Sequence, residues 1–242
     1  MSNLLIIGKE LPDSLDIAEA FSVNGRTVFS SLKPGADFAN FESENIFCAP
    51  TNRASAISAH SFLLNAETKI QTIDEYLLIF DAPYFQSKFQ SDNESEISLA
   101  SDTMINNYLF FTSEILKRLT QNKEPAIVSF LLKTAPTKLE VLQNQTKINA
   151  LPTSNIVSVA QSAFIANAEN FASNIQEHPY ISVLLSKVPY GTDQLQNDKE
   201  IGNWLCSAFD SLKNSKHNQN LKAAATWNKV GTKVSSGFSL FK

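Results

Sequence analysis

Few side chains in this sequence have the type and spacing that acid–base chemistry requires. Lys187 and Tyr190 form a Lys-x-x-Tyr pair, and a tyrosine can act as a general acid when its hydroxyl is within hydrogen-bond reach of a substrate. Lys133 borders a long polar segment and is a further candidate. A tyrosine and a lysine often fall near each other by chance, so these residues are weak candidates for catalysis. No Ser/His/Asp or Cys/His arrangement stands out along the sequence.

Metal ligation is not indicated either. The two cysteines, Cys48 and Cys206, lie far apart without a C-x-x-C spacing. The three histidines have no ligand partner near them in the sequence: His60, His178 and His217. Cys48 lies in an apolar run, and a free cysteine there behaves as a small core residue. We therefore expect no metal site.

Composition limits the class of protein. With 43% apolar residues, a chain of 242 residues can form one α/β domain with a large core, so we expect a single domain over residues 1–242. The net charge of -4, without a block of like charge, gives no basic surface for nucleic acid. No signal-peptide pattern is present, and no apolar run approaches the roughly 18 to 20 residues that span a bilayer. We expect a cytoplasmic protein that binds neither nucleic acid nor membrane.

Apolar runs alternate with helical patterns, which predicts a parallel sheet covered by helices on both faces. The expected helices cover residues 15–22, 56–65, 101–120, 156–176 and 198–213. The expected strands cover residues 4–7, 27–30, 44–49, 76–80, 126–132, 181–185 and 233–241. Residues 76–80 are continuously apolar, which is typical of a strand in the middle of such a sheet. Residues 133–155 contain Pro136 and Pro152 and predict a long excursion beside the core.

Two of the predicted helices carry more apolar side chains than one buried stripe requires. On residues 101–120 the stripe is Met104, Tyr108, Phe111, Ile115 and Leu119, with Leu109 and Phe110 beside it. On residues 156–176 we place the stripe at Val159, Ala163, Ala166, Asn170 and Phe171. The surplus apolar surface predicts that these two helices form an interface between copies of the chain.

The order and spacing of four segments resemble the short-chain dehydrogenase/reductase family. The segments are residues 4–21 (first strand, phosphate loop and first helix), 51–55 (the turn after the third strand), 78–83 (the fourth strand and its Asn-Ala-Gly turn) and 163–175 (the helix of the catalytic pair). The resemblance covers nearly the whole chain and is weakest after Lys213. It implies a doubly wound, NAD(P)-binding Rossmann-like α/β/α fold and assembly as a dimer or tetramer.

The phosphate loop departs from the family pattern. Of its three glycines only Gly8 is retained, while Pro12 and Ser14 hold the second and third positions. Pro12 has no N–H to donate and adds bulk where the backbone would approach a phosphate. Pro12 and Asp13 instead predict an ordinary helix start with an acidic residue in its first turn.

The remaining cofactor positions are altered too. The resemblance places Ala49 where an aspartate would contact adenine, and Asp81 and Ala82 where the Asn-Ala-Gly turn would border the ribose. Lys33 follows the second strand and could meet a 2′-phosphate, so NADPH remains an alternative, although a solvated loop lysine is the simpler interpretation. We expect a vestigial cleft without a bound cofactor.

The family's catalytic positions hold residues without acid–base function: Met104, Leu132, Val157 and Gln161. Val157 stands at the position of the tyrosine general acid and cannot transfer a proton, and Gln161 at the lysine position carries no charge. A small shift would bring Asn106 or Asn107 to the Met104 position. No Tyr-x-x-x-Lys pair occurs within residues 144–174.

Three functions follow as hypotheses. The leading one is a non-catalytic interaction or scaffold protein, homo-oligomeric through residues 101–120 and 156–176 or associated with an active relative. The second is a dinucleotide or small-ligand sensor whose cleft is lined by Leu131, Leu132 and Val157. The third is an NAD(P)-dependent oxidoreductase with relocated residues such as Tyr190 and Lys187.

Overall fold

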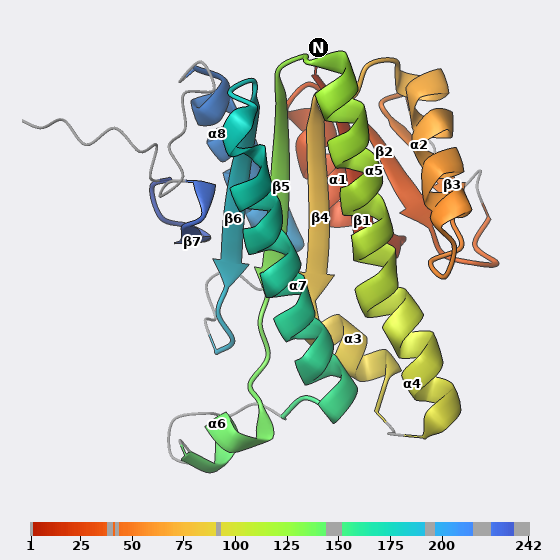
Figure 1. Cartoon of the computed structure of the whole chain (residues 1–242), viewed down its shortest axis with the longest axis vertical. Helices are drawn as coiled ribbons and strands as arrows, with labels where there is room; N and C mark the ends of the chain where they lie inside the picture. Colours follow the sequence, from red (N-terminus) through yellow and green to blue (C-terminus); the bar gives the residue numbers. More distant parts are fainter. Residues whose placement is uncertain are drawn as a thin grey trace, which may run out of the picture.

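A computed structural model describes residues 2–37, 41, 44–90, 93–143, 152–191, 197–214 and 224–234. Their strands form one parallel sheet of seven strands in the order β3-β2-β1-β4-β5-β6-β7 (Figure 1). The strands are β1 (Ser2–Leu11), β2 (Arg26–Leu32), β3 (Ile46–Pro50), β4 (Glu75–Asp81), β5 (Ala126–Lys133), β6 (Ile181–Val188) and β7 (Trp227–Lys229). The predicted doubly wound fold is confirmed, and the strand order reverses between β1 and β4.

Helices cover both faces of the sheet and the end toward which the strands point. Figure 1 shows α2, α5 and α7 on one face, α1 and α8 on the other, and α3, α4 and α6 near the carboxyl ends of the strands. The bounds are α1 (Leu15–Val23), α2 (Ala56–Ile70), α3 (Ala82–Lys88), α4 (Glu94–Ser101), the π-helical turn η2 (Asp102–Asn106), α5 (Asn107–Asn122), α6 (Lys138–Gln143), α7 (Asn155–Asn174), the 3-10 turn η3 (Ile175–Glu177) and α8 (Asp198–Asn214). None of the helices in the described ranges is long and apolar enough to cross a membrane.

The sheet separates two apolar cores because successive side chains of a strand point to opposite faces. Ile7 joins the core under α2, α5 and α7, where Phe164 is also buried. Ile6 joins the core under α1 and α8, together with Phe209. Burial on both faces explains why the central strands are continuously apolar.

Two elements differ from their predicted positions. The last strand in the described residues is Trp227–Lys229; residues 233 and 234 are not in a strand, and the rest of the predicted strand, residues 235–241, lies outside the described residues. This strand has only three residues, and Asn228 secures it by donating from its side chain to the carbonyl of Leu185 at 3.2 Å. Such a short segment carries no apolar pattern that a sequence analysis could detect.

The buried face of α7 also differs from the predicted stripe. Val159 is 57% exposed and Ala166 is exposed, whereas the buried residues are Val157, Ala160, Phe164, Ala168, Phe171 and Ala172. Alanine and serine on every side of this helix leave its period poorly marked. The series 157, 164 and 171, each one heptad apart, contains its large buried side chains and marks the true face.

Candidate functional site

Four charged side chains meet at the carboxyl ends of the central strands. Lys9 lies near the end of β1, Asp81 ends β4, Lys133 ends β5, and Asp198 is the first residue of α8. We call these four residues the carboxyl-end cluster. In doubly wound sheets, ligands bind outside the carboxyl ends of the strands where the strand order reverses, which here is between β1 and β4.

Every charge of the carboxyl-end cluster has two partners of opposite sign. The Lys9 ammonium lies 2.9 Å from Asp81 Oδ2 and 2.6 Å from Asp198 Oδ2. The Lys133 ammonium lies 3.1 Å from Asp81 Oδ2 and 3.0 Å from Asp198 Oδ1. Asp81 also accepts the backbone N–H of Tyr84 at 3.1 Å and so caps α3. Two cations and two anions thus form a closed, neutral group.

Mutual attraction keeps Lys9 and Asp81 ionised despite their burial. Burial by itself would lower the pKa of Lys9, but the charges of Asp81 and Asp198 outweigh it and raise that pKa. Burial by itself would raise the pKa of Asp81, but Lys133 and Lys9 outweigh it and lower that pKa. The negative charge of Asp81, which the resemblance places beside the ribose, is therefore already neutralised by the protein itself.

Gly8 is needed for close packing of the protein against itself. Its φ is +103°, and a Cβ at this position would lie 2.2 Å from the carbonyl oxygen of Ile79 and 2.5 Å from the hydroxyl of Tyr108. That hydroxyl donates to Ile79 O at 2.5 Å. The Arg53 guanidinium donates to the carbonyl of Gly8 at 2.7 Å and to Glu10 Oε1 at 3.1 Å. The loop at Gly8 is thus filled by protein groups.

The helix after this loop begins at residue 15, as the apolar spacing predicted, and not at Pro12 and Asp13. Strand β1 continues to Leu11, and α1 begins at Leu15 with Ser14 as its N-cap. Asp13 therefore precedes the helix, and the acidic residue of its first turn is Asp16. The N–H groups of Ser14 and Leu15 donate to the carbonyls of Glu10 and Pro12, at 3.1 and 3.0 Å. These amides are not directed at an anion.

The other predicted cofactor residues do not assemble into a site. Ala49 and Ala82 are buried in β3 and at the start of α3. Lys33 is exposed in the loop after β2. Of the predicted cofactor positions, only Asp81 belongs to the carboxyl-end cluster.

The positions of the predicted catalytic set are mostly in the core. Met104, Leu132 and Val157 are at most 2% exposed and pack under α2, α5 and α7. Leu131 packs in the opposite core, so Leu131, Leu132 and Val157 do not line one cleft, and that expectation is wrong. Adjacent strand residues point to opposite faces, which explains the separation. Gln161 accepts the backbone N–H of Ala135 at 3.2 Å and supports the chain after β5.

The relocated pair proposed from the sequence is not organised for proton transfer. Lys187 is exposed near the end of β6, whereas Tyr190 is partly buried beyond that strand. The backbone N–H of Tyr190 donates to Thr134 Oγ1 at 3.0 Å. Within the described part of the chain, no hydrogen bond joins the side chains of Lys187 and Tyr190.

A different tyrosine–lysine pair was missed by the sequence analysis. Tyr84 and Lys88 stand four residues apart on α3, and the Lys88 ammonium donates to the Tyr84 hydroxyl and lies 4.0 Å from the ring centroid. Burial and a hydrogen bond to Asp13 raise the pKa of Tyr84. Burial also lowers the pKa of Lys88. The Tyr-x-x-x-Lys spacing is visible in the sequence, but it lies outside residues 144–174, where the family resemblance places the catalytic pair.

A cavity of about 410 Å³ opens beside this pair. Its lining includes Glu10 of β1, Asn52 and Arg53 after β3, Lys88 and Phe89 at the end of α3, and Leu99 of α4. The volume lies within the range of small-molecule sites, and the lining combines apolar surface with a few polar groups.

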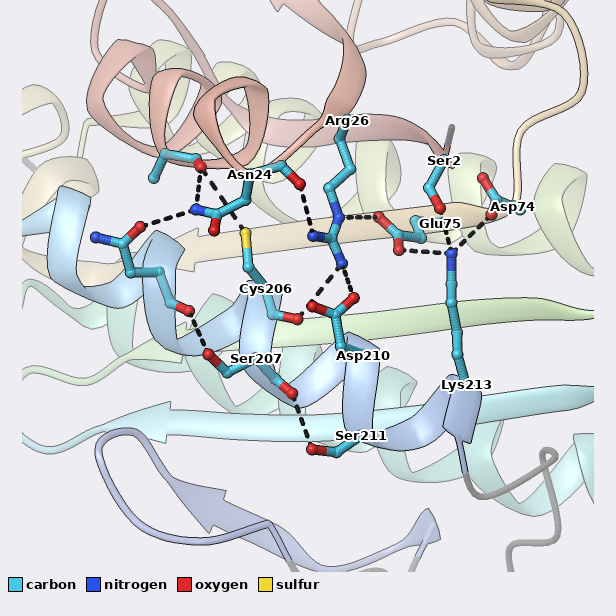
Figure 2. Close-up of polar contacts among 12 residues, drawn as sticks. Ser2, Asn24, Arg26, Asp74, Glu75, Cys206, Ser207, Asp210, Ser211 and Lys213 are labelled. Atoms are coloured by element: carbon cyan, nitrogen blue, oxygen red, sulfur yellow. Dashed lines mark hydrogen bonds and ion pairs between the residues drawn. The ribbon is translucent and has the colours of Figure 1, made fainter.

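A second group of charges lies at the opposite end of the sheet (Figure 2). We call it the amino-end cluster, and its members are Arg26, Asp74, Glu75, Asp210 and Lys213. Glu75, which is fully buried, lies 3.3 Å from Arg26 Nε and 2.8 Å from the Lys213 ammonium. Arg26 also pairs with Asp210 at 2.5 Å, and Lys213 pairs with Asp74 at 2.8 Å. Asp210 and Lys213 belong to α8, so the same helix reaches both clusters.

Within the described residues, no group of three or more His, Cys, Asp or Glu side chains could hold a metal ion. Cys48 is buried, as predicted. Burial raises the pKa of the Cys206 thiol to about 12.

Comparison with known proteins gives a structural likeness only. No family model matches the sequence, and no curated protein does. A 3-ketoacyl-(acyl-carrier-protein) reductase from Brucella melitensis, solved with NADH, is 10% identical with a TM-score of 0.64, covering 95% of this chain and 96% of that chain. The chain has the short-chain dehydrogenase/reductase fold.

Two further solved structures agree. A short-chain dehydrogenase/reductase family oxidoreductase from Aeromonas hydrophila is 9% identical with a TM-score of 0.63, over 86% of this chain and 91% of that chain. The Bacillus cereus enoyl-acyl carrier protein reductase, solved with NADP+ and an indole naphthyridinone, is 13% identical with a TM-score of 0.61, over 98% and 96%. The short-chain dehydrogenase/reductase fold therefore extends over nearly all of the chain.

Proposed function

We propose that this protein is a non-catalytic binding protein that holds a small polar ligand in the 410 Å³ cavity. The observation that carries the proposal is the carboxyl-end cluster. Its four charges neutralise one another at the reversal point of the sheet, where a cofactor of this fold would react. Val157, at the position of the general acid, is buried in the core.

The cavity favours a ligand about the size of a nucleoside. Phe89 and Leu99 supply apolar surface, and Asn52 and Thr103 supply polar groups beside Arg53. The similar structures from Brucella melitensis and Bacillus cereus were solved with NADH and NADP+. We therefore propose adenosine, its monophosphate or the adenosine part of a dinucleotide as the ligands to test first.

Thermal unfolding with adenosine, AMP, NADH and NADPH tests this proposal. A ligand at 100 times its Kd adds about 2.7 kcal/mol, which corresponds to a rise in Tm of roughly 5 to 11 °C for a domain of this size. Asn52→Ala should reduce the rise, while Lys187→Ala, far along the sheet at β6, serves as the control. If none of the four compounds raises the Tm, the proposal of a ligand in the cavity fails and the role as an interaction protein remains.

A reductase remains the second candidate, because Tyr84 and Lys88 form a hydrogen-bonded Tyr-x-x-x-Lys pair and Lys88 lines the cavity. The tyrosine could supply a proton to a carbonyl, although its raised pKa makes it a weak acid at neutral pH. Oxidation of NADPH with a panel of ketones tests this function. Activity that Tyr84→Phe abolishes would establish it, and activity would also overturn the non-catalytic proposal.

We also propose that two copies pair through α5 and α7, in a cytoplasmic protein that could associate with an active relative. Leu109 of α5 and Val159 of α7 are 47% and 57% exposed, so each helix presents apolar surface to solvent. Light scattering after size exclusion should give a dimer or tetramer at tens of micromolar. Leu109→Glu combined with Val159→Glu should convert it to a monomer, and a wild-type monomer would contradict the interface.

A further inference from the structure

We infer that Lys9 and Lys133 form an anion-binding site that Asp198 occupies from within the chain, and that a carboxylate or phosphate group of a small metabolite displaces Asp198 from it. The proposal concerns the carboxyl-end cluster, not the cavity beside Arg53. It is therefore independent of the ligand proposed for that cavity.

Asp198 binds the two lysines as a free oxyanion would. Its Oδ2 lies 2.6 Å from the Lys9 ammonium, and its Oδ1 lies 3.0 Å from the Lys133 ammonium. One carboxylate thus bridges two cations with its two oxygens. A carboxylate or phosphate of a ligand has the oxygens needed to make the same pair of contacts.

The two aspartates of the cluster are held differently. Asp81 ends a central strand, accepts the backbone N–H of Tyr84 and caps α3, so it is fixed in place. Within the part of the chain that the structure describes, the Asp198 carboxylate bonds only to the two lysines. Asp198 can therefore be exchanged for another anion without loss of any other side-chain hydrogen bond to the described residues.

The charge count favours such an exchange. With Asp198 removed, two lysines share the single carboxylate of Asp81, and the site carries one net positive charge. Lys9, Lys133 and Asp198 remain 10–17% exposed, so the site is in contact with solvent. Its place at the reversal of strand order is the ligand position of doubly wound sheets.

Titration of the full-length protein with inorganic phosphate at constant ionic strength, followed by calorimetry and thermal unfolding, tests the inference. Wild type should bind phosphate weakly, since Asp198 competes for the lysines. Asp198→Asn should bind it about tenfold more tightly. Asp210→Asn, at the other end of α8, should behave as wild type and controls for a general loosening of that helix.

A double variant controls for the lysines. Lys133→Met combined with Asp198→Asn leaves the neutral pair Lys9 and Asp81, and it should lose the phosphate response without a buried unpaired charge. Acetate in place of phosphate shows which group the site prefers: stronger binding of acetate assigns a carboxylate ligand, and stronger binding of phosphate assigns a phosphate ester.

Three results would overturn the inference. The first is an equal response of Asp198→Asn and Asp210→Asn. The second is a phosphate response that the double variant retains. The third is a response of Asp198→Asn with none in wild type up to 50 times the Kd of that variant, which would make Asp198 a fixed structural member.

Discussion

The two ends of the sheet hold buried charges in different ways. The carboxyl-end cluster has two cations and two anions, and each lysine contacts both aspartates. The amino-end cluster has two cations and three anions, and its outer member Asp210 is 59% exposed at the side chain. The first cluster has no spare charge and the second has a surplus carboxylate. Removal of one anion should therefore cost more free energy of unfolding at the carboxyl end than at the amino end.

The largest effect is expected for Asp81→Asn at the carboxyl end. Asparagine still caps α3, so the change removes the charge alone and leaves two lysines with one carboxylate. Breaking a buried ion pair from one side costs about 3–5 kcal/mol in free energy of unfolding. Urea denaturation measures this loss, and a loss below about 1 kcal/mol would place the cluster among weak surface pairs.

A smaller effect is expected for Glu75→Gln at the amino end. Arg26 keeps Asp210 and Lys213 keeps Asp74, so no cation is left unpaired. The loss should be about 1–3 kcal/mol, the cost of weakening hydrogen bonds of a buried charged group. Urea denaturation of both variants compares the loss in free energy of unfolding at the two ends, with Glu124→Gln, at an exposed position, as the neutral control. The comparison of the two ends is wrong if Glu75→Gln lowers the free energy of unfolding more than Asp81→Asn does.

Acid should weaken the carboxyl-end cluster through Asp81. The folded pKa of Asp81 is lowered, so its contribution is complete above the unfolded pKa of about 3.9 and is lost as pH falls through the folded value. Each unit of lowering corresponds to about 1.4 kcal/mol. The free energy of unfolding, measured from pH 7 to 2, should fall less steeply in Asp81→Asn than in wild type. Parallel curves would contradict this assignment.

The smallest effect is expected for Asp210→Asn. Its carboxylate is largely solvated, so water screens its attraction to Arg26, and Glu75 continues to neutralise that guanidinium. The loss should be less than about 1 kcal/mol. Added salt should further reduce the difference in stability between Asp210→Asn and wild type. Thermal unfolding of both proteins at low and high salt measures this reduction.

The sequence predicted the fold better than the site. Continuous apolar runs such as residues 76–80 marked the central strands, because a strand buried on both faces needs no polar side chain. The carboxyl-end cluster was missed because its members come from four separate elements, of which Asp198 lies on a helix. Lys133 ends β5 and Lys9 lies near the end of β1, and the shared edge formed by the ends of parallel strands could have indicated their meeting.

The resemblance to a family pointed to several positions that lie in the core. Positions such as Val157 and Leu132 were judged by what they lack, and the structure places both in the core. The pair Tyr84 and Lys88 has the spacing that was sought, but it occurs on α3 instead of α7. Local spacing does not tell which helix faces the cavity, since that depends on the packing of the sheet.

Helix α8 extends from one end of the sheet to the other and contacts both charged clusters. Its first residue belongs to one cluster, and Lys213, in its last turn, belongs to the other, 15 residues further along and about 23 Å away. One residue inserted between these ends would turn Asp198 by about 100° relative to Lys213, so both ends could not be in register together. The number of residues between Asp198 and Lys213 is therefore fixed by the length of the strands along which α8 packs. An altered length could be tolerated only in the connections outside this helix.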